Sequence, residues 1–195
     1  MDTTLIDLSP TRLERRRLLA AGGLFALGAT AAIGLAAPGR ALAGKATMTD
    51  ADDLAILNVA LGLEYQAIAA YQVGAESGLL TKPVLDVALK FQGHHKAHAE
   101  VLAGTVGKLG GTPAMAMRTE DYRFPVDTLK DQADVLRFAA GLEQGAASAY
   151  LGAVPQFSNR ALARAAASIL GDETMHWAIL LNVLGEDPVP AAFIG

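Results

Sequence analysis

A glutamate followed about thirty residues later by a histidine occurs twice in this chain, each time within alanine-rich, otherwise apolar sequence. The two copies are Glu64 with His95 and His98, and Glu143 with Glu173 and His176. A carboxylate buried in apolar helical sequence is costly unless it is paired or bound to a cation. Carboxylates and imidazoles that recur at matched spacing therefore indicate a metal site in the core of a helix bundle.

The spacing within each copy suits a shared cation. Residues three apart lie on one face of a helix, so Glu173 and His176 can bind the same ion, and so can His95 and His98. Glu64 and Glu143 can each complete one half of the site or bridge two ions. Three glutamates supply a charge of −3, which neutralises a second ion less well than four would and makes oxidised iron less favoured. We therefore expect one or two ions.

His94 is the alternative to His95 as a ligand. It lies four residues before His98, which is another workable ligand spacing. We prefer His95 because it aligns with Glu173 in the second copy, whereas His94 lies about 100° further around the helix. His94 is then expected to be solvated or to contact a ligand side chain.

Tyr71 and Tyr150 each follow the glutamate of their copy by seven residues, two helical turns along the same face. Their hydroxyl groups could donate hydrogen bonds to ligand carboxylates and so fix the ligands in place. Core packing is the alternative role for these two rings.

The composition limits which metals and partners are expected. The 195 residues include no cysteine, which excludes disulfides and thiolate ligands. Oxygen and imidazole nitrogen suit iron or manganese, with zinc as a further candidate. The net charge is −4 and no basic stretch with interleaved aromatic residues occurs, so metal ions are expected as partners and nucleic acid is not.

Four helices must position these residues, and the sequence favours an all-α fold. Start and stop signals place them at about 49–76, 83–110, 129–154 and 158–184. The ligand pairs are centred near Leu80 and Asn159, as expected for two antiparallel hairpins. Residues 112–128 lack a helical period, so we predict an antiparallel four-helix bundle with one long crossover between the second and third helices. Pro155 either kinks the end of the third helix or ends it early.

Residues 1–43 predict an export signal, which leaves 44–195 as one domain. Arg15-Arg16 followed by Leu18-Leu19 resembles a twin-arginine translocation signal, and Ala41-Leu42-Ala43 offers a small-x-small cleavage site. Cleavage after Ala43 would give a periplasmic or otherwise extracytoplasmic protein with no stable membrane insertion. An uncleaved membrane anchor is the alternative, because the apolar stretch at 18–37 is nearly long enough to span a bilayer.

The order Glu, His-x-x-His, Glu, Glu-x-x-His on four successive helices resembles the ferritin-like superfamily of di-metal carboxylate proteins, in particular its exported bacterial members. The resemblance covers about 49–184 and departs from the family pattern at His95, where that pattern has glutamate. It implies a ferritin-like bundle that binds iron or manganese and carries out oxidoreductase chemistry or handles metal or peroxide. A non-catalytic, stress-related or metal-binding bundle is the alternative function, and the protein could form a homo-oligomer.

Overall fold

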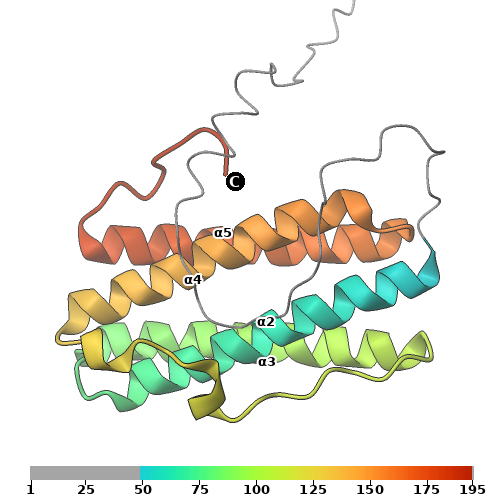
Figure 1. Cartoon of the computed structure of the whole chain (residues 1–195). Coiled ribbons are helices and arrows are strands. Elements are labelled where there is room, and N and C mark those ends of the chain that lie inside the picture. The colour runs from blue at the N-terminus through green and yellow to red at the C-terminus, as the bar shows by residue number, and fades with distance from the viewer. Residues whose placement is uncertain (1–48, 195) are drawn as a thin grey trace, which may run out of the picture.

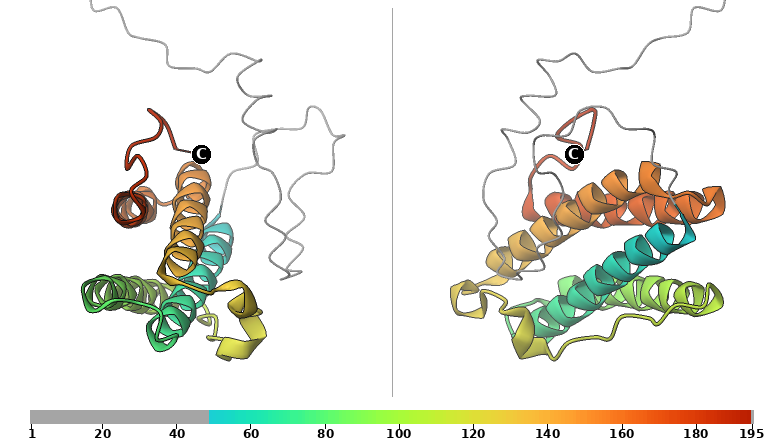
Figure 2. Two further views of the ribbon diagram at one scale, coloured as in Figure 1. Left: turned by 90° about the vertical axis from the view of Figure 1, so that its left-hand side faces the viewer. Right: turned by 45° about the vertical axis from the view of Figure 1, so that its right-hand side comes forward.

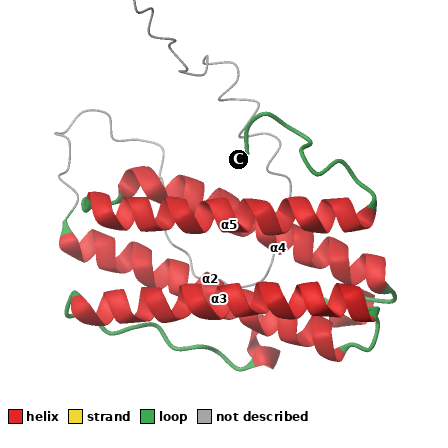
Figure 3. Ribbon diagram, turned by 180° about the vertical axis from the view of Figure 1, so that it is seen from behind, coloured by secondary structure: helices red, strands yellow, loops and turns green. Residues whose placement is uncertain are grey.

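The computed structural model describes residues 49–194, and these residues contain helices and no strand (Figures 1 and 3). The four long helices are α2 (Asp50–Glu76), α3 (Lys82–Lys108), α4 (Gln132–Ala153) and α5 (Arg160–Leu184). The α2–α3 and α4–α5 hairpins form two layers that pack against each other (Figure 2). The predicted antiparallel four-helix bundle is confirmed. The predicted export signal and its cleavage site lie outside the described residues.

The helix ends follow local capping chemistry. Thr49 forms a capping box with Asp52 at the start of α2, and Gly185 ends α5 in the left-handed conformation at φ 76°. The third helix begins at Gln132, three residues later than the sequence indicated, because the Asp131 side chain caps it by accepting a hydrogen bond from the Asp134 amide at 2.9 Å. Pro155 ends the helix early: α4 stops at Ala153 and the chain continues as a 3-10 turn, η3 (Val154–Gln156).

Residues 109–131 form the single long crossover, which carries the chain from the end of α3 back along the bundle to the start of α4 (Figure 1). It includes two short 3-10 helices, η1 (Thr119–Tyr122) and η2 (Val126–Thr128). The Asn58 side chain ties it to α2 by donating to the Thr112 carbonyl at 3.2 Å and accepting from the Ala114 amide at 2.7 Å. These contacts keep the crossover on the outside of the bundle, so the core is left to the four long helices.

Each hairpin is tied to the other near its ends. Asp53 on α2 is buried and accepts hydrogen bonds from the Ser158 amide and hydroxyl, both at 2.7 Å, and from the Asn159 amide at 2.9 Å. Gln132 on α4 accepts from the Thr81 amide and hydroxyl, both at 2.8 Å. The first helix of each hairpin therefore holds the start of the second helix of the other, which sets the register between them.

The core consists of two apolar clusters, and each long helix contributes to both. One cluster is built around Leu61, Val106, Tyr150 and Ile169, and the other around Tyr71, Phe91, Leu136 and Leu180. By length and composition alone α2 could span a membrane, a property that it shares with core helices of soluble bundles. Helix α2 nevertheless buries Glu64, which lies along the helix between its residues in one cluster and its residue in the other. Each of the other three long helices also buries polar residues between its contributions to the two clusters.

Candidate metal centre

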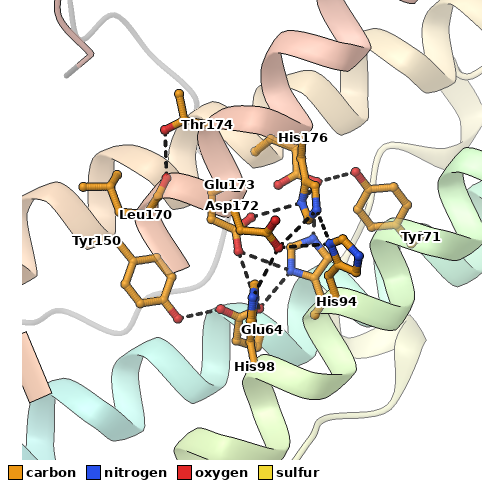
Figure 4. A network of polar contacts seen from close by, with 12 residues as sticks. Glu64, Tyr71, His94, His98, Tyr150, Leu170, Asp172, Glu173, Thr174 and His176 are labelled. Atoms are coloured by element: carbon orange, nitrogen blue, oxygen red, sulfur yellow. Dashed lines mark hydrogen bonds and ion pairs between the residues drawn. The ribbon is translucent and has the colours of Figure 1, made fainter. Parts of the chain in front are cut away.

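Polar side chains from the four long helices form a network of contacts (Figure 4). Along the helices this layer lies between the two apolar clusters. Five of the six predicted ligands are at most 2% exposed, and the sixth, His98, has a side chain that is 16% exposed. The six residues come from four helices: Glu64 from α2, His95 and His98 from α3, Glu143 from α4, and Glu173 and His176 from α5. The structure therefore brings all six predicted residues into one site.

The six side chains form two overlapping groups, each able to offer four ligand atoms that lie within 4.8 Å of one another. The first group is Glu64, His95, His98 and Glu173, and the second is His95, Glu143, Glu173 and His176. Each group combines residues from both sequence copies, and its residues come from three helices. His95 and Glu173 belong to both groups, so they are the central residues of the site.

Short contacts hold the first group together. The Nδ1 atom of His95 lies 2.8 Å from Glu64 Oε2, and Nδ1 of His98 lies 3.5 Å from the same oxygen. Nδ1 of His98 also lies 3.2 Å from Glu173 Oε1. Glu64 and Glu173 thus face each other across the two imidazole rings of α3.

The second group is slightly wider. The Nε2 atom of His95 lies 3.3 Å from Glu143 Oε1, and Nδ1 of His176 lies 3.4 Å from the same oxygen. Nδ1 of His176 lies 3.7 Å from Glu173 Oε2. The two nitrogens of the His95 ring therefore face the glutamates of opposite hairpins, Glu64 and Glu143.

The two tyrosines contact the candidate ligands across the hairpins. Tyr71 on α2 donates a hydrogen bond to Glu143, and Tyr150 on α4 donates to Glu64 at 2.5 Å. Burial and the adjacent carboxylates raise the pKa of both phenols, so the two hydroxyl groups stay protonated and act as donors. The seven-residue spacing indicated a role beside a ligand, but it did not reveal that each tyrosine serves the glutamate of the other copy.

The imidazoles are charged partners of the carboxylates in the metal-free protein. Burial alone would lower their pKa, but the adjacent glutamate carboxylates outweigh it and raise the pKa of His95 to about 10 and those of His98 and His176 to about 9. Burial would conversely raise the pKa of Glu143, but the adjacent His176 and His95 rings outweigh it and hold that pKa well below its ordinary value. The three imidazole rings therefore offset part of the carboxylate charge of the layer.

Five buried donor or acceptor atoms of this layer have no hydrogen-bond partner: His98 Nδ1, Glu143 Oε2, both carboxylate oxygens of Glu173, and His176 Nδ1. Leaving buried polar atoms unpaired costs about 1–3 kcal/mol each, more when they are charged. All five belong to predicted ligands, and a cation that displaced the imidazole protons would be a common partner for them. Oxygen and imidazole nitrogen are donors that iron, manganese and zinc all accept, so the residues fit such an ion.

Asp172 is a site residue that the sequence reasoning missed. Its Oδ2 atom lies 3.3 Å from Nε2 of both His98 and His176, and 3.0 Å from Nδ1 of His94. His94 also lies 2.9 Å from His176, so His94, Asp172 and His176 form a third group at the rim, while His95 lies in the two inner groups. The available signal was the position of Asp172, four residues before His176 and thus on the same helical face.

The rim of the centre opens to a surface pocket of about 360 Å³ between α3 and α5. His98 and Asp172 form its inner wall, and Val101, Ile169 and Met175 line its sides. His98 is thus the most accessible of the six predicted ligands, and the centre comes closest to solvent at this pocket.

Comparison with known proteins agrees with this geometry. The fold is similar to a crystal structure of ferritin like, diiron-carboxylate proteins from Bacillus anthracis str. Ames, with 25% sequence identity, a TM-score of 0.58, and 69% of this chain and 97% of that chain covered. It is also similar to a conserved hypothetical protein from Mycobacterium tuberculosis, with 23% identity, a TM-score of 0.64, and 74% of this chain and 99% of that chain covered. No functionally curated protein matches the sequence.

The family model of the ferritin-like domain matches residues 52–186, and this range includes every residue of the candidate metal centre. The four-helix bundle and the fold comparison lead to the same assignment. The chain belongs to the ferritin-like domain family.

Proposed function

We propose that this protein is an exported metal-binding protein that holds one or two ions of iron or manganese and carries out redox chemistry on the metal, oxygen or peroxide. The proposed ligands are Glu64, His95, His98, Glu143, Glu173 and His176. Bound iron or manganese would supply the one-electron chemistry. The description of the Bacillus anthracis relative as a diiron-carboxylate protein supports this assignment.

The observation that carries the proposal is the set of five unpartnered buried atoms in one layer. A bundle stabilised only by imidazolium–carboxylate pairs would be expected to satisfy these atoms with hydrogen bonds. Glu173 offers two unpartnered oxygens, one toward each of the two inner groups. Because Glu173 belongs to both groups, it would help to hold an ion in either of them.

Neighbouring residues would orient the ligands. The carboxylate of Asp172 faces the outward Nε2 atoms of His98 and His176, which leaves the Nδ1 atom of each ring facing the inner carboxylates. Tyr71 and Tyr150 hold one oxygen of Glu143 and of Glu64, respectively. Such outer contacts fix ring and carboxylate orientation, and their loss typically weakens metal binding 10- to 100-fold.

Non-catalytic metal binding is the second candidate function, and the burial of the site favours it. Five of the six proposed ligands are at most 2% exposed, and apolar clusters cover the layer on both sides. Catalysis requires an open coordination position that a substrate can reach. The pocket beside His98 is the feature that favours catalysis instead.

Elemental analysis of protein purified from the exported compartment tests the proposal. We expect one to two equivalents of iron or manganese per chain, and the absence of any stoichiometric metal would overturn the assignment. Turnover of Fe(II) or hydrogen peroxide by the loaded protein would then separate the catalytic function from the non-catalytic one. Mass spectrometry of the same sample tests the export proposal, which requires Gly44 at the N-terminus.

A further inference from the structure

The apolar cluster around Tyr71 contains a cavity of about 270 Å³ at the end of the bundle where α2 and α5 end and α3 and α4 begin (Figure 1). All four long helices line it, with Tyr71 from α2, Val84 from α3, Val135 and Leu142 from α4, and Leu180 from α5. We propose that this cavity binds a small uncharged apolar organic molecule with its inner end against Tyr71.

The volume is too large for an ordinary packing defect. Protein interiors are close-packed and contain few voids larger than a water molecule. A cavity of roughly 150 Å³ lined by aliphatic and aromatic side chains stays dry and binds benzene. By the same measure this cavity would hold about two fused aromatic rings or an alkyl chain of about ten carbon atoms.

The lining selects against polar ligands. The cavity is bordered by aliphatic and aromatic side chains and by Gly74, and the one hydroxyl among them, that of Tyr71, is already donated to Glu143. A water molecule needs two to four polar partners to occupy such a site, and a charged ligand would lose its hydration without compensation. Small residues such as Ala70 and Ala139 leave the space in which a ligand would lie.

The apolar C-terminal tail of the chain does not fill the cavity. It leaves α5 at the same end of the bundle and turns away over that helix (Figure 1). Val189 and Phe193 in the tail are 76% and 83% exposed. The rim of the cavity includes Pro83 and Val183, which are both exposed, so a ligand could enter between the start of α3 and the end of α5.

Tyr71 places the cavity beside the metal centre. Its ring lines the cavity, its hydroxyl contacts Glu143, and its ring centroid lies 5.4 Å from that of His95. A molecule in the cavity would thus be one side chain away from the proposed ligands. Its use as a substrate rests on the proposed function, but the binding of an apolar molecule does not.

A titration of the purified protein with naphthalene, followed by methyl NMR, tests the inference. We expect saturable shifts at the methyl groups of Val84, Val135, Leu142 and Val183, with Leu61 and Val106 of the other cluster unchanged. Ala139→Leu should abolish the shifts by filling the cavity. Ala149→Leu, on an exposed face of the same helix, should leave them intact.

An absence of saturable shifts in the parent protein, or shifts of equal size in both apolar clusters, would overturn the inference whether or not Ala139→Leu folds. Circular dichroism establishes that each variant keeps its helices, and Val84→Phe offers a second way to fill the cavity. The metal content of each sample is measured in parallel. Naphthalene binding by metal-free protein would support the cavity even if the proposed metal function failed, and stoichiometric metal without naphthalene binding would refute only the cavity.

Discussion

The two hairpins share one plan, but the first places bases where the second places acids. When Glu64 is aligned with Glu143 and His98 with His176, His94 corresponds to Asp172 and His95 corresponds to Glu173. Each base contacts its acidic counterpart across the bundle, with His94 Nδ1 at 3.0 Å from Asp172 and His95 Nδ1 at 3.7 Å from Glu173. The difference between the hairpins therefore places a base of the first beside an acid of the second at both positions.

This pairing changes how the departure at His95 is interpreted. From the sequence alone, His95 is expected to lower the metal affinity of the first copy only, because that copy has one carboxylate and the second has two. In the structure His95 and Glu173 lie in both inner groups, and each group contains two glutamates and two histidines. Histidine at position 95, where the family pattern has glutamate, therefore affects both groups. It also avoids the repulsion that a fourth buried carboxylate would cause.

The largest effect is expected from Glu173→Ala, which removes the acidic partner common to both groups. Both oxygens of Glu173 are buried and lack hydrogen-bond partners, so this carboxylate has more oxygens available to bind a cation than Glu64 or Glu143. We expect metal affinity to fall by at least roughly 100-fold, the upper figure for loss of an outer contact. Metal titration measures this, with the surface substitution Glu100→Ala as the control, and unchanged metal binding would show that the site is elsewhere.

His95→Glu makes the two hairpins alike and should separate stability from metal binding. The metal-free variant loses an imidazolium that contacts Glu64 and Glu143, and it gains a fourth buried carboxylate. Breaking a buried ion pair costs about 3–5 kcal/mol, so the free energy of unfolding should fall by that amount without metal. Iron occupancy and any Fe(II) oxidation should rise in the loaded protein.

His95→Gln is the matched control for this variant, because it removes the imidazolium without adding a charge. Chemical unfolding of the metal-free and iron-loaded forms of both variants provides the measurement. If His95→Glu were as stable as the parent without metal, the pairing between the hairpins would not be the reason for the histidine.

The helix ends and the residues of the polar layer could be predicted because both follow from local rules. Thr49, Pro83 and Gly185 are capping or first-turn residues, and the predicted ligands recur at helical spacing. Asp172 was missed because the repeat has histidine at the matching position, so no acidic pattern drew attention to it. The crossed tyrosine contacts and the sharing of His95 and Glu173 depend on how two hairpins pack, which helical spacing within one hairpin does not specify.

The charge pairs also predict an effect of pH on stability. The folded-state pKa values of His95, His98 and His176, about 9 to 10, lie above the ordinary value of 6.5. Their stabilisation is therefore complete below about pH 6.5 and is lost as the pH rises through 9 to 10. The melting temperature of metal-free protein should fall between about pH 6.5 and pH 10, whereas a bound ion replaces the protons and should weaken this fall. Parallel thermal scans of both forms between pH 6 and 10 provide the check, and identical profiles would contradict it.

The crossed tyrosine contacts should give smaller, matched effects in the two hairpins. Tyr71→Phe frees one oxygen of Glu143, and Tyr150→Phe frees one oxygen of Glu64. We expect each variant to weaken metal binding by about 10- to 100-fold, with the helices unchanged. Tyr65→Phe on α2 is the control, and metal titration is the measurement. A loss confined to one of the two variants would mean that only one inner group binds an ion.

The smallest effects are expected where the hairpins are tied at their ends, and here the comparison predicts an asymmetry. Asp53 and Gln132 lie eleven residues before Glu64 and Glu143, but the Asp53 carboxylate accepts three hydrogen bonds at a fully buried position and Gln132 accepts two at a more exposed one. Hydrogen bonds to a charged group contribute about 1.5–3 kcal/mol, and neutral ones about 1 kcal/mol.

Asp53→Ala should therefore lower the free energy of unfolding by about 2–3 kcal/mol, and Gln132→Ala by about 1 kcal/mol, as measured by urea denaturation. Asp53→Asn keeps one acceptor oxygen and should fall between them. This ranking of stability losses matters because Asp53 holds the start of α5, the helix that carries Glu173 and His176. If Asp53→Ala also weakens metal binding while Gln132→Ala does not, the position of α5 depends on this tie. Equal losses of stability would instead mean that the packing of the two apolar clusters alone sets the register of the hairpins.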